Sequence, residues 1–297
     1  MSGVLILAGP TASGKTDLAI ELARRFDAEI IGADSRQIYA GMPVGTAAPN
    51  EMQLSAVPHH LTAFLEPYER YSAARFAQDA VAKIQHIHAR GRRAIVVGGT
   101  GFYIRALTGA VELAAAHDEE LRARLAHEAR VHDPEFLHEW LMLRDAPRAG
   151  MLQPRDTYRV LRALEVALAP GHGRERERPL PTLAVLGIPF LKVFLDVNVE
   201  QLVHRIERRT DAMLEHGLLE EAERVGANAV ASSAVGYPQA LAYLRGESTY
   251  QELRTTLIRA TRRYAKRQQM WFRSEPQTTW APPDAVERLA REKLDWL

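Results

Sequence analysis

A phosphate-binding loop is the clearest chemical feature of the sequence. Gly9-Pro-Thr-Ala-Ser-Gly-Lys-Thr16 has the G-x-x-x-x-G-K-[ST] spacing and lies between an apolar run at 4–8 and a helical pattern at 17–25. In such a loop, backbone N–H groups and the positive end of the following helix point at phosphate oxygens. The spacing leaves open whether those phosphates belong to a nucleotide or to another diphosphate. The residues predicted to bind diphosphate are Gly9, Pro10, Thr11, Ala12, Ser13, Gly14, Lys15 and Thr16.

Each residue type in this loop has a chemical reason. The amine of Lys15 can neutralise phosphate charge, and the hydroxyl of Thr16 can hold a magnesium ion. We therefore expect Mg2+ as the cofactor, with Thr16 as its protein ligand.

Two further polar groups follow apolar runs in the same way. Asp34 follows the run 28–33, and Thr100 lies in the Gly-Gly-Thr-Gly segment that follows the run 93–97. Because the carboxyl ends of parallel strands meet at one edge of a sheet, we expect both residues beside Lys15. A carboxylate there could accept a proton from a substrate. An Asp-Ser pair is also common in turns and helix caps, so both interpretations of Asp34 remain open.

A basic segment lies near the end of the sequence. Residues 254–273 contain no Asp or Glu and carry Tyr264, Trp271 and Phe272 among the cations. Positive charge with aromatic rings suits a phosphate backbone with unpaired bases, although a run of charge is more often only a solvated face. The formal net charge of the whole chain is only +1, so this positive charge is local. The cations are Arg254, Arg259, Arg262, Arg263, Lys266, Arg267 and Arg273.

The elements that must position these groups alternate between strands and helices. Apolar runs predict strands at 4–8, 28–33, 93–97, 182–187, 191–196 and 278–280. Helical patterns cover 17–25, 73–90, 118–132, 134–143, 156–168 and a long region, 199–273, interrupted at 234–238. Buried strands linked by helices predict an α/β fold, a parallel sheet with helices on both faces. We predict a core domain of 1–112 and 183–297 and a helical insertion domain of 113–182, in which 170–179 is an exposed loop.

Composition excludes several classes of function. The 297 residues include no cysteine, which excludes disulfides, thiolate metal sites and a cysteine nucleophile. No apolar run approaches the roughly 20 residues of a membrane span, and no charged leader precedes the first strand. We therefore expect a cytoplasmic protein without membrane contact.

A set of motifs carries a family resemblance. Besides the phosphate loop, the motifs are Asp34-Ser-Arg-Gln-Ile-Tyr39, Gly45-Thr-Ala-Ala-Pro49, Pro58-His-His-Leu61, Val97-Gly-Gly-Thr100, Arg162-Ala-Leu-Glu-Val166, Val235-Gly-Tyr237, Tyr264-Ala-Lys-Arg-Gln268 and Trp271-Phe-Arg273. In this order, they resemble the motifs of tRNA dimethylallyltransferases of the bacterial type, over nearly the whole chain. The resemblance implies a fold like that of P-loop NTPases and nucleotide kinases.

The resemblance implies a reaction and residues that perform it. The family transfers a dimethylallyl group from dimethylallyl diphosphate to N6 of adenosine 37, beside the anticodon of tRNAs that read codons beginning with U. Asp34 matches the family's general base, and Thr100 matches a residue at the reacting centre. The expected partners are the anticodon stem-loop of tRNA and dimethylallyl diphosphate, and the enzyme is expected to be a monomer. The implied tRNA contacts are Asp34, Ser35, Arg36, Gln37, Arg122, Tyr158, Arg159, Val160, Leu161, Arg162, Arg263, Lys266, Arg267, Gln268, Trp271 and Arg273.

Two functions of other classes compete with this interpretation. A small-molecule kinase would also use Lys15 and Thr16, but it would bind ATP and would not need the basic helix. An RNA-binding module with a regulatory nucleotide would keep that helix, but it would not need Asp34 beside the phosphates.

Overall fold

The chain folds into two compact units. The computed structural model describes residues 3–111, 119–168 and 180–297. One unit, the core unit, comprises Met1–Val111 and Leu180–Leu297, and the other, the helical unit, comprises Glu112–Pro179. The predicted loop at 170–179 and the predicted start of the insertion at 113 lie outside the described residues.

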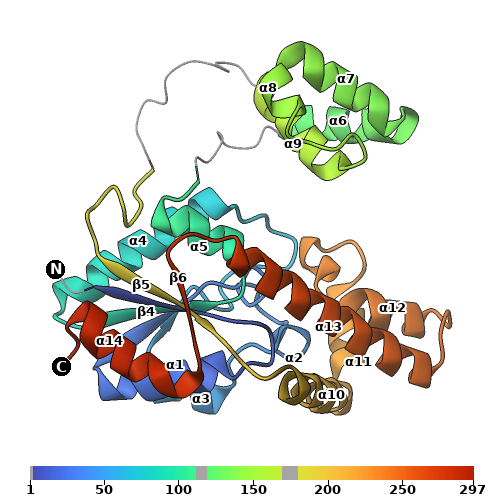
Figure 1. Ribbon diagram of the computed structural model, residues 1–297. Helices are drawn as coiled ribbons and strands as arrows, with labels where there is room; N and C mark the ends of the chain where they lie inside the picture. Colours follow the sequence, from blue (N-terminus) through green and yellow to red (C-terminus); the bar gives the residue numbers. More distant parts are fainter. Residues whose placement is uncertain (1–2, 112–118, 169–179) are drawn as a thin grey trace. The chain divides into compact units, whose positions relative to one another are not determined.

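A six-stranded sheet forms the centre of the core unit (Figure 1). Its strands lie in the order β3-β2-β4-β1-β5-β6, and every neighbouring pair is parallel. The prediction of a parallel sheet is therefore confirmed, although no apolar run predicted the two-residue strand β3. The bounds are β1 Val4–Ala8, β2 Ala28–Gly32, β3 His59–His60, β4 Arg93–Gly98, β5 Phe190–Leu195 and β6 Thr278–Ala281.

Helices cover both faces of this sheet, which explains why its central strands are apolar on both sides. All five residues of β1 are buried. One face packs against α1 and α14, and Figure 1 shows α4 and α5 on the other. The bounds of the helices around the sheet are α1 Lys15–Arg25, α2 Pro43–Thr46, α3 Glu51–Ala56, α4 Ala73–Ala89, α5 Gly101–Thr108 and α14 Val286–Leu294.

The long helical region predicted at 199–273 is a group of separate helices. Two breaks fall at Gly217 and Gly226, whose φ angles of 94° and 75° suit glycine best. Thr249 begins the last helix with a capping box that includes Glu252. The helices are α10 Val199–Glu215, α11 Leu218–Val225, α12 Tyr237–Leu244 and α13 Tyr250–Arg273, with a 3₁₀ turn at Val230–Ser233 between α11 and α12. Another 3₁₀ turn, Pro283–Ala285, follows β6 and precedes α14.

The strand predicted at 182–187 is wrong. This segment forms turns in which the Leu186 N–H donates to the Thr182 carbonyl and the Gly187 N–H donates to that of Ala184. A short apolar run does not by itself distinguish a strand from a compact turn. Here Gly187 takes a φ of 62°, which is incompatible with an extended strand at this position.

The helical unit has a small apolar core of its own. Leu125, Leu137, Leu141 and Leu164 are buried together in it. The bounds are α6 Glu119–Val131, α7 Pro134–Arg144, α8 Ala146–Ala149 and α9 Thr157–Leu168. None of the helices in the described parts of the chain is long and apolar enough to cross a membrane.

A buried carboxylate in the core unit holds the short helix α2. Glu221 of α11 is 2% exposed, and it accepts hydrogen bonds from the N–H groups of Val44 (2.9 Å) and Gly45 (2.6 Å) and from the hydroxyl of Tyr237 (2.7 Å). A negative charge at the N-terminal end of a helix also satisfies N–H groups that have no partner inside it. A Cβ at residue 45 would lie only 2.7 Å from the Tyr237 ring, so the packing of this ring against α2 requires Gly45.

Replacing this carboxylate should destabilise the fold. Glu221→Ala leaves three donors without their acceptor, so we expect the free energy of unfolding to fall by about 3 kcal/mol. Glu223→Ala, on the exposed side of the same helix, should change it by less than about 0.5 kcal/mol. Urea unfolding followed by circular dichroism measures both. Equal effects of the two substitutions would contradict the role given to Glu221.

Candidate active site

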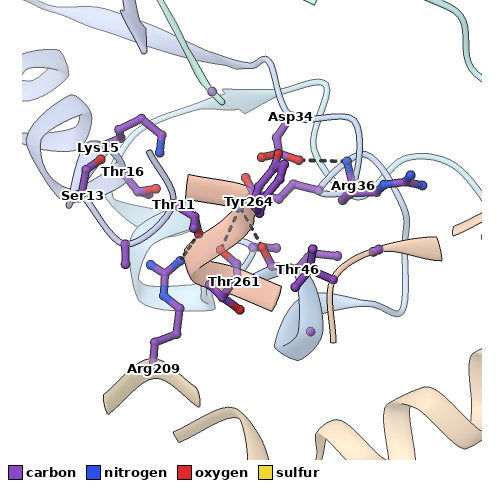
Figure 2. A pocket seen from close by; sticks show the side chains of 18 of the residues that line it. Thr11, Ser13, Lys15, Thr16, Asp34, Arg36, Thr46, Arg209, Thr261 and Tyr264 are labelled. Carbon is purple, nitrogen blue, oxygen red and sulfur yellow. Dashed lines mark hydrogen bonds between the residues drawn. The ribbon is translucent and has the colours of Figure 1, made fainter. Parts of the chain in front are cut away.

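A polar cavity of about 480 Å³ lies in the core unit, where the phosphate loop and the segment after β2 meet (Figure 2). It is lined by residues 11–17 of the loop, by 34–37 after β2 and by 45–48 around α2. Residues from α3, β4, α10, α13 and the segment 233–235 complete the lining. The predicted convergence of Lys15 and Asp34 on one site is therefore present in the structure.

The phosphate loop has the conformation that its glycines predict. Gly14 takes a left-handed φ of 86° immediately before α1 begins. The amine of Lys15 donates a hydrogen bond to the Pro10 carbonyl at 2.8 Å. The pKa of Lys15 is lowered to about 8. Burial is the main cause, the positive charge of Arg209 adds to it, and the negative charge of Asp34 acts in the opposite direction. Lys15 is thus a cation in a site that is unfavourable for positive charge until an anion enters.

Two arginines of α10 were missed by the sequence analysis. Arg205 donates to the Ser13 carbonyl (3.1 Å), and Arg209 donates to the Thr11 hydroxyl (3.0 Å, Figure 2). Burial lowers the pKa of Arg209, while the charges of Asp17 and Asp34 oppose this. The two arginines are four residues apart, a spacing that places them on one face of a helix. That spacing was the only signal in the sequence, and nothing there linked α10 to the loop.

Asp34 combines both roles that the sequence left open. One oxygen of its carboxylate accepts a hydrogen bond from the Arg36 N–H at 2.9 Å, which is the turn role (Figure 2). The same residue also lines the cavity. Its negative charge acts to raise the pKa of Lys15. It also helps to raise the pKa of Tyr264, for which burial is the largest cause and Asp34 the second. The carboxylate therefore lies within electrostatic range of both groups.

Thr100 forms hydrogen bonds with the segment that lines the cavity. Its hydroxyl accepts a hydrogen bond from the Ser35 N–H at 2.9 Å and donates one to the Ser35 hydroxyl at 3.3 Å. Among the described residues that line the cavity, Ser35 is present and Thr100 is not. In this structure Thr100 therefore holds the 34–37 segment in place.

The basic helix α13 turns different residues to the cavity and to solvent. Tyr264, Arg267 and Gln268 line the cavity. Arg263, Lys266 and Arg273 are exposed. Trp271 packs against Gly101 and beneath the Arg105 guanidinium, which lies 4.3 Å from its ring centre. Only part of the predicted tRNA-contact set on this helix is therefore open to a large ligand.

The helical unit contains the predicted tRNA contacts at residue 122 and in the stretch 158–162, whereas those at 34–37 line the cavity of the core unit. Tyr158 and Arg159 are exposed on α9, and Arg122 on α6 and Leu161 on α9 are partly exposed. Arg162 pairs with Glu165 at 2.8 Å. Val160 is fully buried in the core of this unit, so its side chain is not open to a ligand in this structure. A five-residue stretch covers more than one turn of a helix, so one of its members must face inward.

Comparisons with known proteins give a consistent family. A sequence model described as IPP transferase matches residues 37–275, and one described as Isopentenyl transferase matches residues 2–63. The chain is 42% identical over 299 residues to tRNA dimethylallyltransferase 2 of Geotalea uraniireducens (strain Rf4), an alignment that covers 99% of this chain and 96% of the relative. The chain belongs to the IPP transferase family. The family resemblance predicted from the motifs is thus confirmed.

Solved structures agree with this membership of the IPP transferase family. The full-length tRNA isopentenylpyrophosphate transferase of Bacillus halodurans has a TM-score of 0.71 and 33% identity, covering 99% of this chain and 97% of that one. A eukaryotic dimethylallyltransferase described as acting on tRNA has a TM-score of 0.78 at 24% identity, covering 98% of this chain and 76% of that one, and it supports the fold alone. The predicted P-loop fold class is confirmed.

Arg209 provides a direct test of the site in this family member. Arg209→Met keeps the apolar stem and removes the charge, so we expect the Kd for inorganic diphosphate, measured with Mg2+ by calorimetry, to rise about tenfold or more. Arg208→Met is the matched control, because Arg208 is the exposed neighbour outside the cavity lining. If both variants bound diphosphate as the unchanged protein does, Arg209 would not be part of an anion site.

Proposed function

We infer that this chain is a tRNA dimethylallyltransferase. It transfers the dimethylallyl group from dimethylallyl diphosphate to N6 of adenosine 37 in tRNAs that read codons beginning with U. One observation carries the chemical part of the inference. A single cavity contains an anion site, formed by the loop with Lys15 and Arg209, and a carboxylate, Asp34, within electrostatic range of Lys15. Group transfer from a diphosphate to a weak nucleophile needs both.

Asp34 acts as the general base in this reaction. The N6 amine of adenine is a poor nucleophile, because its lone pair is delocalised into the ring. The nitrogen attacks the allylic carbon that bears the diphosphate, a C–N bond forms, and the C–O bond to diphosphate breaks. The N6 proton passes to the Asp34 carboxylate, whose orientation is fixed by the Arg36 N–H. Thr100 contributes through Ser35, by holding this segment.

The leaving group is stabilised at the other end of the cavity. Negative charge develops on the diphosphate as positive charge develops on the allylic carbon, and fixed cations stabilise that separation. Lys15 and Arg209 supply the positive charge, and the start of α1 supplies backbone N–H groups. Water must also be kept from the allylic centre, since it would compete with the N6 amine.

The residues present fit a magnesium ion bound through the substrate. No group of three or more His, Cys, Asp or Glu suited to a metal ion occurs among residues 3–111, 119–168 and 180–297. The Thr16 hydroxyl lines the cavity, and Mg2+ commonly takes one or two protein ligands together with phosphate oxygens and water. Mg2+ held by Thr16 would neutralise diphosphate charge.

The anticodon arm of tRNA is the second substrate in this proposal. Exposed cations on α13 suit its phosphates, and the reacting base must leave the loop stack to reach Asp34, which is easier in a single-stranded loop. The proposal includes a monomeric enzyme that works in the cytoplasm, where tRNA is available. Light scattering after size-exclusion chromatography tests the monomer.

The product identifies the reaction. The protein is incubated with Mg2+, dimethylallyl diphosphate and an unmodified tRNA bearing adenosines 36 to 38, and the digested nucleosides are weighed by mass spectrometry. We expect N6-isopentenyladenosine at position 37. Consumption of ATP with a small-molecule acceptor, and no modified nucleoside, would instead identify a kinase.

Asp34→Asn isolates the role of the base. Asparagine can still accept the hydrogen bond from the Arg36 N–H, but it cannot take up a proton at neutral pH. We expect kcat to fall by about a hundredfold to ten-thousandfold, with tRNA affinity within a few-fold. Single-turnover kinetics and filter binding measure these quantities. Near-normal turnover would remove Asp34 as the base.

The exposed face of α13 can be tested through salt dependence. Arg263→Glu should weaken tRNA binding and reduce the slope of log affinity against log salt by about one for each phosphate that the protein no longer neutralises. Arg288→Glu makes the same charge change on α14, where Arg288 is 70% exposed, and should leave the slope unchanged. If Arg263→Glu also left the slope unchanged, this face of α13 would be only solvated.

A further inference from the structure

A glutamine of the basic helix is buried against the phosphate loop. Gln268 is 5% exposed and follows Tyr264 by one helical turn. Its Oε1 accepts a hydrogen bond from the Thr11 N–H at 2.9 Å, and its Nε2 donates one to the Gly99 carbonyl at 3.0 Å. One side chain from α13 therefore bridges the loop after β1 and the loop after β4.

The amide is matched to these two partners. A backbone N–H only donates and a carbonyl only accepts, so a residue between them needs one acceptor and one donor at the end of its side chain. Glutamine has both, and they fix which way its amide points. A glutamate would set two oxygens against each other at Gly99, and an apolar residue would leave both backbone groups without a partner.

The bridge changes the part that Thr11 plays in the loop. The Thr11 N–H is taken by Gln268, and its hydroxyl accepts from Arg209. The sequence predicted Thr11 as a diphosphate contact. Its N–H is no longer available for that contact, whereas its hydroxyl, which lines the cavity, can still donate its proton. Through Thr11, Arg209 of α10 and Gln268 of α13 therefore hold the phosphate loop in place.

Gly99 shows how closely the amide fits. A Cβ at residue 99 would lie 2.0 Å from Nε2 of Gln268, a distance at which something must shift. Apart from Gln268, the nearest of the other atoms is the Gly9 carbonyl oxygen, at an ordinary contact distance of 3.5 Å. The Gln268 side chain therefore occupies the space that a side chain at residue 99 would need. A shorter residue at position 268 would leave room for alanine at position 99.

We propose that Gln268 is a positioning residue for the diphosphate loop and not a contact to tRNA. It sets the path of the loop at Thr11 and so the geometry of the loop residues that follow and line the cavity. Its effect falls on the diphosphate substrate, although it stands on the helix whose outer face carries the cations proposed for tRNA. The identity of that substrate rests on the proposed function.

Kinetics separate this role from a tRNA contact. For Gln268→Ala we expect the KM for dimethylallyl diphosphate to rise about tenfold to a hundredfold, since two buried backbone groups lose their partner. The KM for tRNA and its salt dependence should stay within about twofold. Gln269→Ala is the matched control, the same change at the next position, whose side chain does not line the cavity. A rise confined to the KM for tRNA would overturn the proposal.

A double-mutant cycle with Gly99 tests the contact itself. Gly99→Ala in the unchanged protein should displace the amide and weaken binding of inorganic diphosphate as much as Gln268→Ala does. In the Gln268→Ala background the new methyl group has room, so Gly99→Ala should add less than about a twofold effect. If the double variant instead weakened diphosphate binding by the product of the two single effects, the two residues would act independently. That result would overturn the proposal.

The readouts keep this proposal apart from the transferase assignment. Binding of inorganic diphosphate with Mg2+ is measured by calorimetry without tRNA, so it reports on the loop even if the unchanged protein modifies no nucleoside. Thermal melts of each variant establish folding. Gly99→Ala perturbs the bridge without altering α13, so the proposal stays testable if Gln268→Ala fails to fold. Normal diphosphate binding by folded Gly99→Ala and Gln268→Ala would overturn it.

Discussion

The site depends on a phosphate loop that is held from outside by side chains from much later in the chain. Arg205, Arg209 and Gln268 contact the loop across separations of 192, 198 and 257 residues. A loop of this kind has few contacts of its own, and its backbone N–H groups bind phosphate only if they point in one direction. Fixing it with α10 and α13 gives that direction before a ligand arrives, which lowers the entropy lost on binding.

This arrangement places positive charge where the folded chain does not favour it. Burial and Arg209 both lower the pKa of Lys15, which means that its charged form is less stable in the folded protein than in water. Asp34 offsets part of this cost, and a diphosphate would offset more. The positive charge of Arg209 disfavours the charged form of Lys15 but favours an anionic ligand. The site therefore gives up some stability of the fold in return for affinity for that ligand.

Sequence reasoning succeeded where one segment carries its own signal. The phosphate loop is contiguous, and Asp34 follows a buried strand, so the edge of a parallel sheet brings them together. Arg209 was missed, and Gln268 was named only as a tRNA contact, because their partners lie in distant segments. Helical periodicity shows which residues share a face but not what that face contacts. The same limit explains Val160, which the family resemblance placed in a tRNA-contact stretch and which the helical period turns inward.

Under the proposed function, the two faces of α13 act on two different substrates. Leu253, Leu257, Ala265 and Phe272 are buried along it, and Gln268 lies among them. A polar residue in such a stripe needs partners, and the loops after β1 and β4 supply both. The cations can then occupy the solvent face without weakening the packing that holds the helix. Because the inward amide fixes the diphosphate loop and the outward charges meet solvent, substitutions on the two faces should act on different substrates, although they lie within one turn of each other.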